Sequence, residues 1–436
     1  MKVDVAAERA QSRKRLELLA SLAAVIILAV GVRLAFAPLI PPLLNPDSEG
    51  YVQAGWDLLH GNGLDLGLRR TPGYGIFIAA VFGTLGERLS AIVQTQHALG
   101  VVNAALAFML ARAVVGPIGG LIVGVLTALS GPLLLYEHYV MTETLSMTAL
   151  LVALLMTLRA LATGSSRWAL AAGVATGVAL LCRPALQIIM VVGVGGLLIM
   201  FRHLPRRAII TAAAFLLGAS VLMIPWMVKN AVMYDAFTLA GTGRHLLFRL
   251  IRSDTGFDFA RPGGVTALEP EPMASARRVL MEQAAKHDSS SNYKRFREEL
   301  GLSEAATNKL QTVLALEAIR GQPAYYIQGS LGIFWQIFKG EPIDIRREGS
   351  DLSEVDWDRS IRHLVNPPPP RGNRTAAQVW LGVWDPARWG PLIPALFAFG
   401  LAAAVPRREP WVLMIAVTAL APQLLGAAMA GYALRF

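Results

Sequence analysis

The chain has 436 residues, of which 54% are apolar and only 16% are charged. A soluble domain carries about 25% charged residues, so this composition excludes an ordinary soluble protein and a globally disordered one, and it indicates a surface that faces lipid. The single cysteine, Cys182, excludes an internal disulfide. The net charge of +10 lies in short segments between apolar runs, which favours topology signals facing anionic lipid over a nucleic-acid partner.

Apolar runs recur along the chain, and most have about the 20 residues that a membrane-spanning helix needs. We therefore predict an all-α polytopic membrane protein. The predicted spans lie near 18–40, 91–114, 117–136, 142–162, 168–182, 184–201, 208–228, 390–405 and 411–430.

The basic residues predict the orientation of these spans. Residues 1–17 form a basic tail, and the apolar run behind it is too long for the core of a signal peptide. A retained first span with a cytoplasmic N-terminus puts four short arginine-bearing turns inside, in agreement with the positive-inside rule. We therefore expect a multi-pass protein of the plasma or inner membrane. The inside turns lie at Arg112, at Arg159 to Arg167, at Arg202 to Arg207 and at Arg407–Arg408.

The same topology predicts four regions: the tail 1–17, a membrane core 18–228, a mixed external region 229–389, and C-terminal spans 390–436 that end as if truncated. The first outside loop, 41–90, contains helical stretches too short to span, around 48–60 and 74–86. In the external region, segments 274–287 and 292–319 are typical of polar amphipathic helices. The aromatic segment 325–338 is short and contains two glutamines, so we expect it to lie at the membrane interface.

Nearly all polar residues that could take part in catalysis or binding fall on the predicted outside face. Asp47 follows the first span within the motif Asn45-Pro-Asp-Ser-Glu-Gly-Tyr51. One interpretation is that Asp47 and Ser48 cap the next helix, because Asp and Ser are preferred there. The other is a carboxylate at the membrane surface that acts as a general base.

Several basic residues lie at the same predicted boundary. Arg69 and Arg70 precede a turn and an apolar helix that begins near Tyr74, and guanidinium groups suit phosphate oxygens. Ordinary contact with lipid headgroups is the alternative reading of each basic residue. The further candidates for binding an anionic headgroup or substrate are Arg183, Lys229, Arg244 and His245.

The short turn between the third and fourth spans contains Glu137, His138 and Glu143. A histidine with two carboxylates suggests a divalent metal ion as a cofactor, with Glu137 and His138 as ligands, although the spacing matches no strong metal motif. The alternative for Glu143 is the first turn of the fourth span, where an acidic residue suits the helix dipole.

Taken in order, these motifs resemble those of the polytopic GT-C glycosyltransferases, specifically glycosyltransferase family 39, which includes protein O-mannosyltransferases and the lipid A aminoarabinose transferase. The resemblance covers roughly residues 18–250. It rests on Pro46-Asp-Ser-Glu-Gly-Tyr51, Arg70-Thr-Pro-Gly-Tyr74, Glu143, Arg183–Pro184, and Pro225–Trp226 to Asn230.

The resemblance implies a GT-C-like helix bundle that moves a sugar from a polyprenyl-phosphate donor in the bilayer to a protein, lipid or glycan acceptor on the outer face. Asp47 would be the base, and Arg70, Arg183 and Arg244 would stabilise the phosphate. Glu143 and Tyr74 would belong to the substrate site. Many family members have Asp-Glu where this chain has Asp47-Ser48, which puts metal dependence in doubt.

A transporter or lipid flippase is the main alternative, because it also needs many spans and functional charges. The two halves of the chain show no inverted repeat, and the candidate charges lie at one face instead of at mid-membrane. A non-catalytic membrane scaffold would explain the spans but not the ordered acidic and arginine motifs.

Overall fold

The computed structural model describes residues 5–45, 47–241, 243, 246–247, 250, 272–285, 292–339, 358–365 and 373–383. These residues form helices, turns and one isolated bridge between Leu43 and Tyr139, with no other strand pairing among them. The predicted C-terminal spans, Arg407–Arg408, Arg244 and His245 lie outside the described residues. The α-helices are α1 (Val5–Phe36), α2 (Ser48–Leu59), α3 (Gly73–Leu85), α4 (Leu89–Leu129), α5 (Gly131–His138), α6 (Glu143–Thr163), α7 (Ser166–Cys182), α8 (Ile188–Met200), α9 (Pro205–Tyr234), α11 (Met273–Ala285), α12 (Asn292–Leu300), α13 (Glu304–Gly321), α14 (Pro323–Lys339) and α15 (Arg374–Val383).

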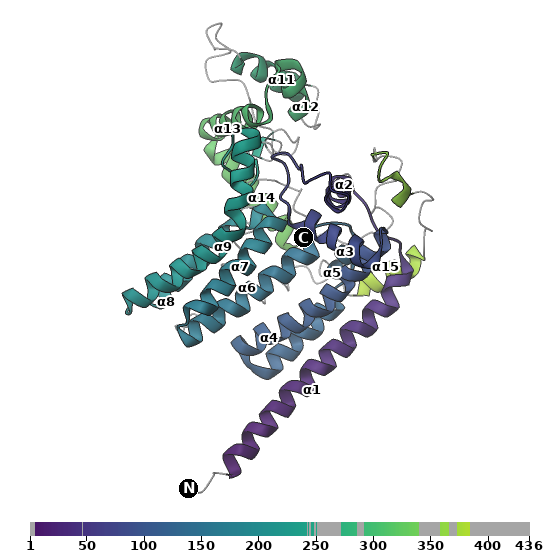
Figure 1. The fold of residues 1–436 in the computed structure, drawn as a ribbon, viewed down its shortest axis with the longest axis vertical. Helices are drawn as coiled ribbons and strands as arrows, with labels where there is room; N and C mark the ends of the chain where they lie inside the picture. Colours follow the sequence, from purple (N-terminus) through teal and green to yellow (C-terminus); the bar gives the residue numbers. More distant parts are fainter. Residues whose placement is uncertain are drawn as a thin grey trace.

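Long apolar helices lie side by side as a bundle (Figure 1). Four helical stretches, within α1, α4, α6 and α9, are long and apolar enough to cross a membrane, and α3, α7 and α8 are shorter apolar helices. The prediction of an all-α polytopic membrane protein is therefore confirmed. Many large apolar side chains of these helices, such as Ile27, Ile118 and Leu217, are exposed, as expected for surfaces that meet lipid.

The helix α4 contains a sharp turn and accounts for two predicted spans. Gly116 has a φ of 90°, outside the helical region, and Pro117 follows it. A Cβ on Gly124 would lie 2.9 Å from the Cβ of Phe108, so the two arms of α4 run back against each other. The second arm is followed, after Ser130, by α5, and together they cover the predicted span 117–136.

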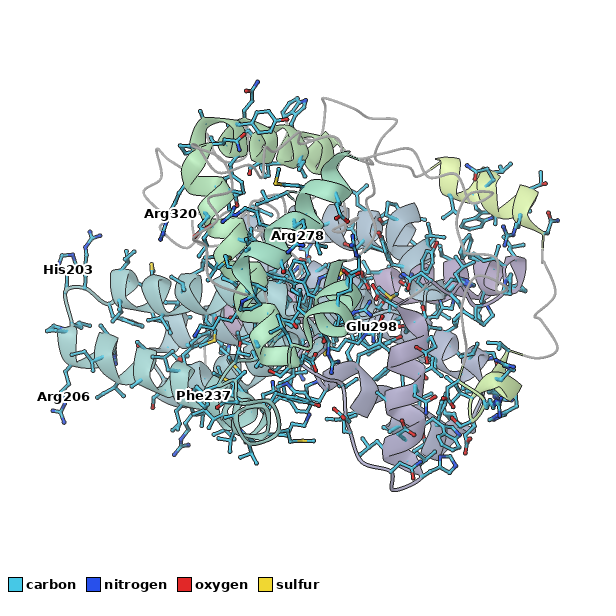
Figure 2. The ribbon with its side chains drawn as sticks, turned by 90° about the horizontal axis from the view of Figure 1, so that it is seen from above. His203, Arg206, Phe237, Arg278, Glu298 and Arg320 are labelled. Atoms are coloured by element: carbon cyan, nitrogen blue, oxygen red, sulfur yellow. The ribbon has the colours of Figure 1, made fainter. Side chains whose placement is uncertain are left out.

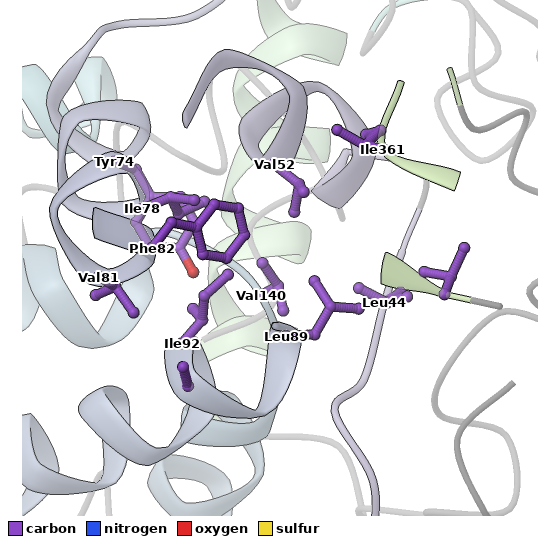
Figure 3. Packing of buried hydrophobic residues seen from close by; sticks show 12 residues of the cluster. Leu44, Val52, Tyr74, Ile78, Val81, Phe82, Leu89, Ile92, Val140 and Ile361 are labelled. Carbon is purple, nitrogen blue, oxygen red and sulfur yellow. The ribbon is translucent and has the colours of Figure 1, made fainter. Parts of the chain in front are cut away.

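One end of the bundle carries α2 and α3, the two short helices predicted in the first outside loop (Figure 1). They pack on the start of α4 through a buried cluster that includes Val52, Tyr74, Ile78, Phe82 and Ile92 (Figure 3). This packing fixes α2 and α3 across the end of the bundle. The loop before α2 is anchored as well, because Leu43 N donates to His138 O at 2.8 Å and Val140 N donates to Leu43 O at 3.0 Å.

The part of the predicted external region that the structure describes is mainly helical. Its helices α11, α12 and α13 share a small buried core around Leu280, Phe296 and Leu314. The predicted single helix over 292–319 is two helices instead, because Gly301 adopts a left-handed φ of 62° between them. The aromatic segment 325–338 is α14, which exposes Tyr325, Ile327, Leu331 and Trp335.

Figure 2 places His203, from the turn between α8 and α9, and Arg206, in the first turn of α9, well away from Arg278 of α11 and Glu298 of α12. The start of α1 also lies at the end of the bundle opposite α2 and α3 (Figure 1). Of the turns predicted to face the cytoplasm, those that the structure describes therefore lie at the end of the bundle opposite α2, at Arg112, at Arg159 to Arg167 and at Arg202 to Arg207. Which side faces the cytoplasm stays a prediction from the positive-inside rule.

Candidate functional site

Asp47 immediately precedes α2, but its carboxylate does not cap that helix. Asn45 takes the capping role instead: its Oδ1 accepts hydrogen bonds from Asp47 N at 2.9 Å and Ser48 N at 3.1 Å. The Ser48 hydroxyl oxygen accepts in return from Asn45 N at 3.0 Å. The expected side-chain cap at Asp47 is therefore wrong. The Asp47 carboxylate makes no hydrogen bond to the amides of α2 and points to other partners.

Those partners are two consecutive arginines, Arg69 and Arg70, of the loop between α2 and α3. Arg69 Nη2 donates to Asp47 Oδ1. Arg70 Nη2 donates to the same oxygen at 3.2 Å and to the Asp47 carbonyl at 3.1 Å. The Asp47 side chain remains 46% exposed, whereas that of Arg70 is only 13% exposed. The arrangement combines an accessible carboxylate with one nearly buried guanidinium group and one more exposed guanidinium group.

Arg70 reaches Asp47 across the first turn of α2. A Cβ on Gly50 would lie 2.1 Å from Arg70 Nη1, so only glycine leaves room for the guanidinium there. The guanidinium carbon also lies 4.9 Å from the centre of the Tyr51 ring, which is within cation–π range. Burial lowers the pKa of Arg70, and the neighbouring charge of Arg69 lowers it further. Because both effects disfavour the charged form of Arg70, a nearby anion would stabilise that charged form.

A second ion pair joins the ends of two spans. Glu143 begins α6, Arg183 follows α7, and Arg183 Nη1 lies 2.8 Å from Glu143 Oε1. The two side chains are 13% and 11% exposed. Among the described residues, the buried Oε2 of Glu143 has no hydrogen-bond partner. The carboxylate therefore holds Arg183 with one oxygen and offers the other.

The charges of both ion pairs act on Tyr51. Burial raises the pKa of Tyr51, and the charges of Arg70, Asp47, Glu143 and Arg183 all act on it. Helix packing explains this proximity, because a Cβ on Gly73 would lie 2.6 Å from Leu181 O. The start of α3 therefore rests against the end of α7.

Tyr74 packs beneath Tyr51 in the protein interior and is not exposed to solvent. It is fully buried, and its ring meets that of Tyr51 edge-on at 5.3 Å. Its hydroxyl donates to Gln96 Oε1 at 2.8 Å, and Gln96 Nε2 in turn donates to Glu137 O and Tyr139 O at 2.9 and 2.7 Å. The structure thus gives the Tyr74 hydroxyl an internal partner.

Lys229 occupies a neighbouring position at the end of α9. Its Nζ lies 3.8 Å from Asp65 Oδ1 and within 4.6 Å of the ring centres of Trp226 and Tyr234. Tyr234 also donates to Asp65 Oδ1, and this hydrogen bond is the main cause that lowers the pKa of Asp65. Lys229 is therefore joined to the loop before Arg69, with Asp65 and not Asp47 as its ion-pair partner.

Glu137 and His138 belong to a buried network that the sequence analysis missed. Arg33 Nη2 lies 2.6 Å from Glu137 Oε1, and His97 Nδ1 lies 2.7 Å from Glu137 Oε2. His97 Nε2 lies 3.0 Å from His138 Nε2. Arg33 also donates to Ala29 O and Ala128 O, both at 3.2 Å. An arginine inside a predicted span was the signal for this network.

The network gives Glu137 and the Nε2 of His138, the two proposed metal ligands, partners within the protein. Both Glu137 oxygens are engaged, one by Arg33 and one by His97. In the part of the chain that the structure describes, no three His, Cys, Asp or Glu side chains are grouped to hold a metal. The residues present therefore do not form a fitting metal site around Glu137 and His138.

Residues 69–228 match the family model described as dolichyl-phosphate-mannose-protein mannosyltransferase. The match confirms over this stretch the resemblance inferred from the motifs. It includes Arg70, Tyr74, Glu143 and Arg183, whereas Asp47 lies before it. No curated protein sequence matches the chain significantly.

The chain is also similar to solved membrane-protein structures. ArnT from Cupriavidus metallidurans bound to undecaprenyl phosphate has 14% identity and a TM-score of 0.41, over 94% of this chain and 76% of that one. The same protein in the apo state has 16% identity and a TM-score of 0.40, over 93% and 77%. The oligosaccharyltransferase AglB from Archaeoglobus fulgidus, in complex with an inhibitory peptide and a dolichol-phosphate, has 12% identity and a TM-score of 0.41, over 96% of this chain and 56% of that one.

Proposed function

We propose that this chain is a membrane glycosyltransferase that moves a sugar from a polyprenyl-phosphate-linked donor to an acceptor on the outer face, with Asp47 as the catalytic base. The family match over residues 69–228 supports the reaction class and the lipid-linked donor. The acceptor is a protein, lipid or glycan hydroxyl. The described arginine-bearing turns, which lie at the end of the bundle opposite α2, support action on the outer face.

The observation that carries this proposal is the placement of Asp47 beside Arg69 and Arg70 at an exposed position. In the proposed reaction the acceptor oxygen attacks the anomeric carbon of the sugar, and the bond from that carbon to the phosphate oxygen breaks. Asp47 takes the proton of the acceptor hydroxyl. The polyprenyl phosphate leaves with the bonding electrons as an anion. A base and cations are thus needed side by side, as they lie here.

The arginines have a defined role in this scheme. A guanidinium group can donate two parallel hydrogen bonds to phosphate oxygens, which a single ammonium group cannot reproduce. Arg70 is nearly buried and fixed by Asp47, Gly50 and Tyr51, so it is already oriented before the donor binds. Arg69 is 38% exposed and lies against the same carboxylate oxygen. Preorganised cations of this kind stabilise charge that develops on a leaving group.

Glu143 and Arg183 complete the proposed substrate site. Arg183 supplies a further cation near Tyr51, and the unpartnered Oε2 of Glu143 suits a hydrogen bond from a substrate hydroxyl. Lys229, Arg244 and His245 stay candidates for the more distant part of a lipid-linked substrate. The positions of Arg244 and His245 lie outside the described residues.

The test is transfer by the purified full chain in detergent. We would add a panel of radiolabelled polyprenyl-phosphate sugars with total membrane extract as the acceptor, and follow loss of the sugar from the lipid. Wild type is compared with Asp47→Asn and with Asp57→Asn, a matched change on α2, where Asp57 bonds to Asn62. Loss of sugar with wild type and Asp57→Asn, but not with Asp47→Asn, supports the proposal.

Two other outcomes would count against it. Equal transfer by Asp47→Asn removes Asp47 from the chemistry and leaves Glu143 as the carboxylate to test next. If a folded wild-type protein releases no sugar from any donor, the glycosyltransferase proposal fails with those donors. A liposome flipping assay then tests the transporter or flippase alternative.

A further inference from the structure

The loop that carries Arg69 and Arg70 is held by the external region. Leu68, the residue before Arg69, donates its backbone N–H to Glu304 Oε1 at 2.8 Å. Glu304 is the first residue of α13. The Leu68 carbonyl accepts from Gly241 N at 2.7 Å. Both polar groups of this buried residue are thus tied to segments more than 170 positions away in the chain.

The contact is shaped to fit the carboxylate of Glu304. Gly67 has a left-handed φ of 58°, and a Cβ there would lie 2.8 Å from Glu304 Oε1. Gly67 N donates to Asp65 Oδ1 at 3.1 Å, which closes the turn. Only glycine combines this backbone conformation with room for the carboxylate. The loop and α13 are therefore matched at this point.

The other side of the contact is fixed as well. Ser303 caps α13 by accepting from Ala306 N at 3.2 Å, which sets the position of the first turn where Glu304 lies. Tyr293 of α12 also hydrogen bonds to Glu304. One turn further along α13, Asn308 Oδ1 accepts from Gly243 N at 2.9 Å. These contacts hold the Glu304 carboxylate in a defined position at the start of α13.

We infer that Glu304 is a positioning residue, which holds Leu68 so that the next two residues, Arg69 and Arg70, both reach Asp47. This inference rests on the proposed function for its effect on sugar transfer, but not for its structural content. Loss of the Glu304 contact frees the Leu68 amide, lets the arginines move away from Asp47, and lowers the turnover step more than donor binding. The external region would then be a part of the transferase site and not only a separate domain.

Three variants of the full chain test the inference. Glu304→Met removes the acceptor at nearly constant size, and Glu304→Gln keeps an oxygen that can accept from Leu68. Glu317→Met is the matched control on the same helix, where it breaks the 2.8 Å pair with Arg277 that joins α13 to α11. Each is measured by deuterium exchange over peptides spanning 64–70 and by kcat and KM for transfer from polyprenyl-phosphate sugars.

We expect Glu304→Met to make amide exchange at Leu68 about tenfold faster and kcat about tenfold lower, with KM changed much less. A factor of about ten corresponds to the free energy of one hydrogen bond to a charged group. Glu304→Gln should restore both values to within about twofold of wild type, since one acceptor oxygen remains. Glu317→Met should leave both unchanged. Wild-type exchange at Leu68 in Glu304→Met, or an equal loss of kcat in Glu317→Met, would overturn the inference.

The exchange measurement also separates this inference from the proposed function. If wild type transfers no sugar, the proposed function fails, and faster exchange at Leu68 in Glu304→Met alone still establishes the positioning contact. If exchange changes while kcat stays at the wild-type value, the contact exists but does not position the arginines for transfer. That result would overturn the inference while leaving the proposed function in place.

Discussion

Arg70 donates to two oxygens of Asp47, the carboxylate at 3.2 Å and the carbonyl at 3.1 Å. The second contact fixes the guanidinium relative to the backbone of α2, so that Arg70 does not depend on the Asp47 side chain alone. If Asp47 turns toward an acceptor, Arg70 can keep its position over Gly50 and Tyr51. This relationship leads to the first two predictions.

Replacing Gly50 with alanine should displace Arg70 without touching any charged group. A Cβ at this position would lie 2.1 Å from Nη1 and 2.6 Å from the guanidinium carbon. We expect Gly50→Ala to lower kcat by roughly 10- to 100-fold, since a misplaced substrate-positioning group costs about this much. Gly332→Ala on α14 is the control, because nothing lies within 4 Å of its Cβ position. Equal activity of Gly50→Ala and wild type would contradict the prediction.

Replacement by lysine should lower activity more at Arg70 than at Arg69. Arg70 is 13% exposed and uses one nitrogen to bridge two oxygens, whereas Arg69 is 38% exposed. Lysine keeps the charge but loses the planar fork. We expect Arg70→Lys to lower kcat/KM by about tenfold more than Arg69→Lys does, given about 1.5–3 kcal/mol for a hydrogen bond to a charged group. Steady-state transfer kinetics measure this difference, and equal losses would argue against a fixed role for Arg70.

The buried pair of Arg33 and Glu137 should govern stability. Both side chains are almost completely buried, and each has partners besides the other. Removing one partner of such a pair leaves an uncompensated buried charge and costs about 3–5 kcal/mol. We therefore expect Arg33→Met to lower Tm in detergent strongly. Arg13→Met is the control, because its pair with Glu17 is exposed and should contribute little.

A double variant refines this prediction. Arg33→Met combined with Glu137→Gln removes both charges and should recover part of the lost Tm, because no unpaired ion remains. His97 loses its carboxylate partner in the same variant, so recovery should be incomplete. A double variant less stable than the sum of the single changes would contradict the account of the network.

The stability contributed by the loop before Arg69 should depend on pH, because Asp65 in this loop is titratable. The hydrogen bond from Tyr234 holds the pKa of Asp65 below its usual value of 3.8. A carboxyl group with a lowered pKa in the folded state stabilises that state above pH 3.8, and this contribution is lost as the pH falls through the folded pKa. Asp65→Asn should therefore remove part of the acid-dependent decline in Tm below about pH 4. An unchanged slope would contradict the contact.

The sequence predicted the helices that depend on local pattern. The spans now seen as α1, α6 and α9 follow from long apolar runs, and the short helices α2 and α3 follow from runs too short to span. The reversal inside α4 agrees with the two separate predicted spans 91–114 and 117–136, and the structure places it at Gly116. These features depend on neighbours in the chain, which is why composition and periodicity suffice.

The site itself could be predicted only in part. The motifs pointed to Asp47, Arg70, Glu143 and Arg183, and the structure groups them around Tyr51. The cap at Asp47 was wrong because its carboxylate pairs with Arg69 and Arg70, which lie 22 and 23 positions further along the chain. No local pattern could reveal that Glu137 pairs with Arg33, 104 positions away. Likewise, the bond between Glu304 and Leu68 joins residues 236 positions apart.

The central claim is that the Asp47 carboxylate takes the proton of the acceptor. The most direct measurement is transfer by Asp47→Ala, in which the carboxylate is absent, with and without added sodium formate as a small external base. The account predicts that Asp47→Ala loses transfer, and that formate restores part of it in proportion to concentration but restores none to Arg70→Gln. Undiminished transfer by Asp47→Ala without formate would contradict the claim.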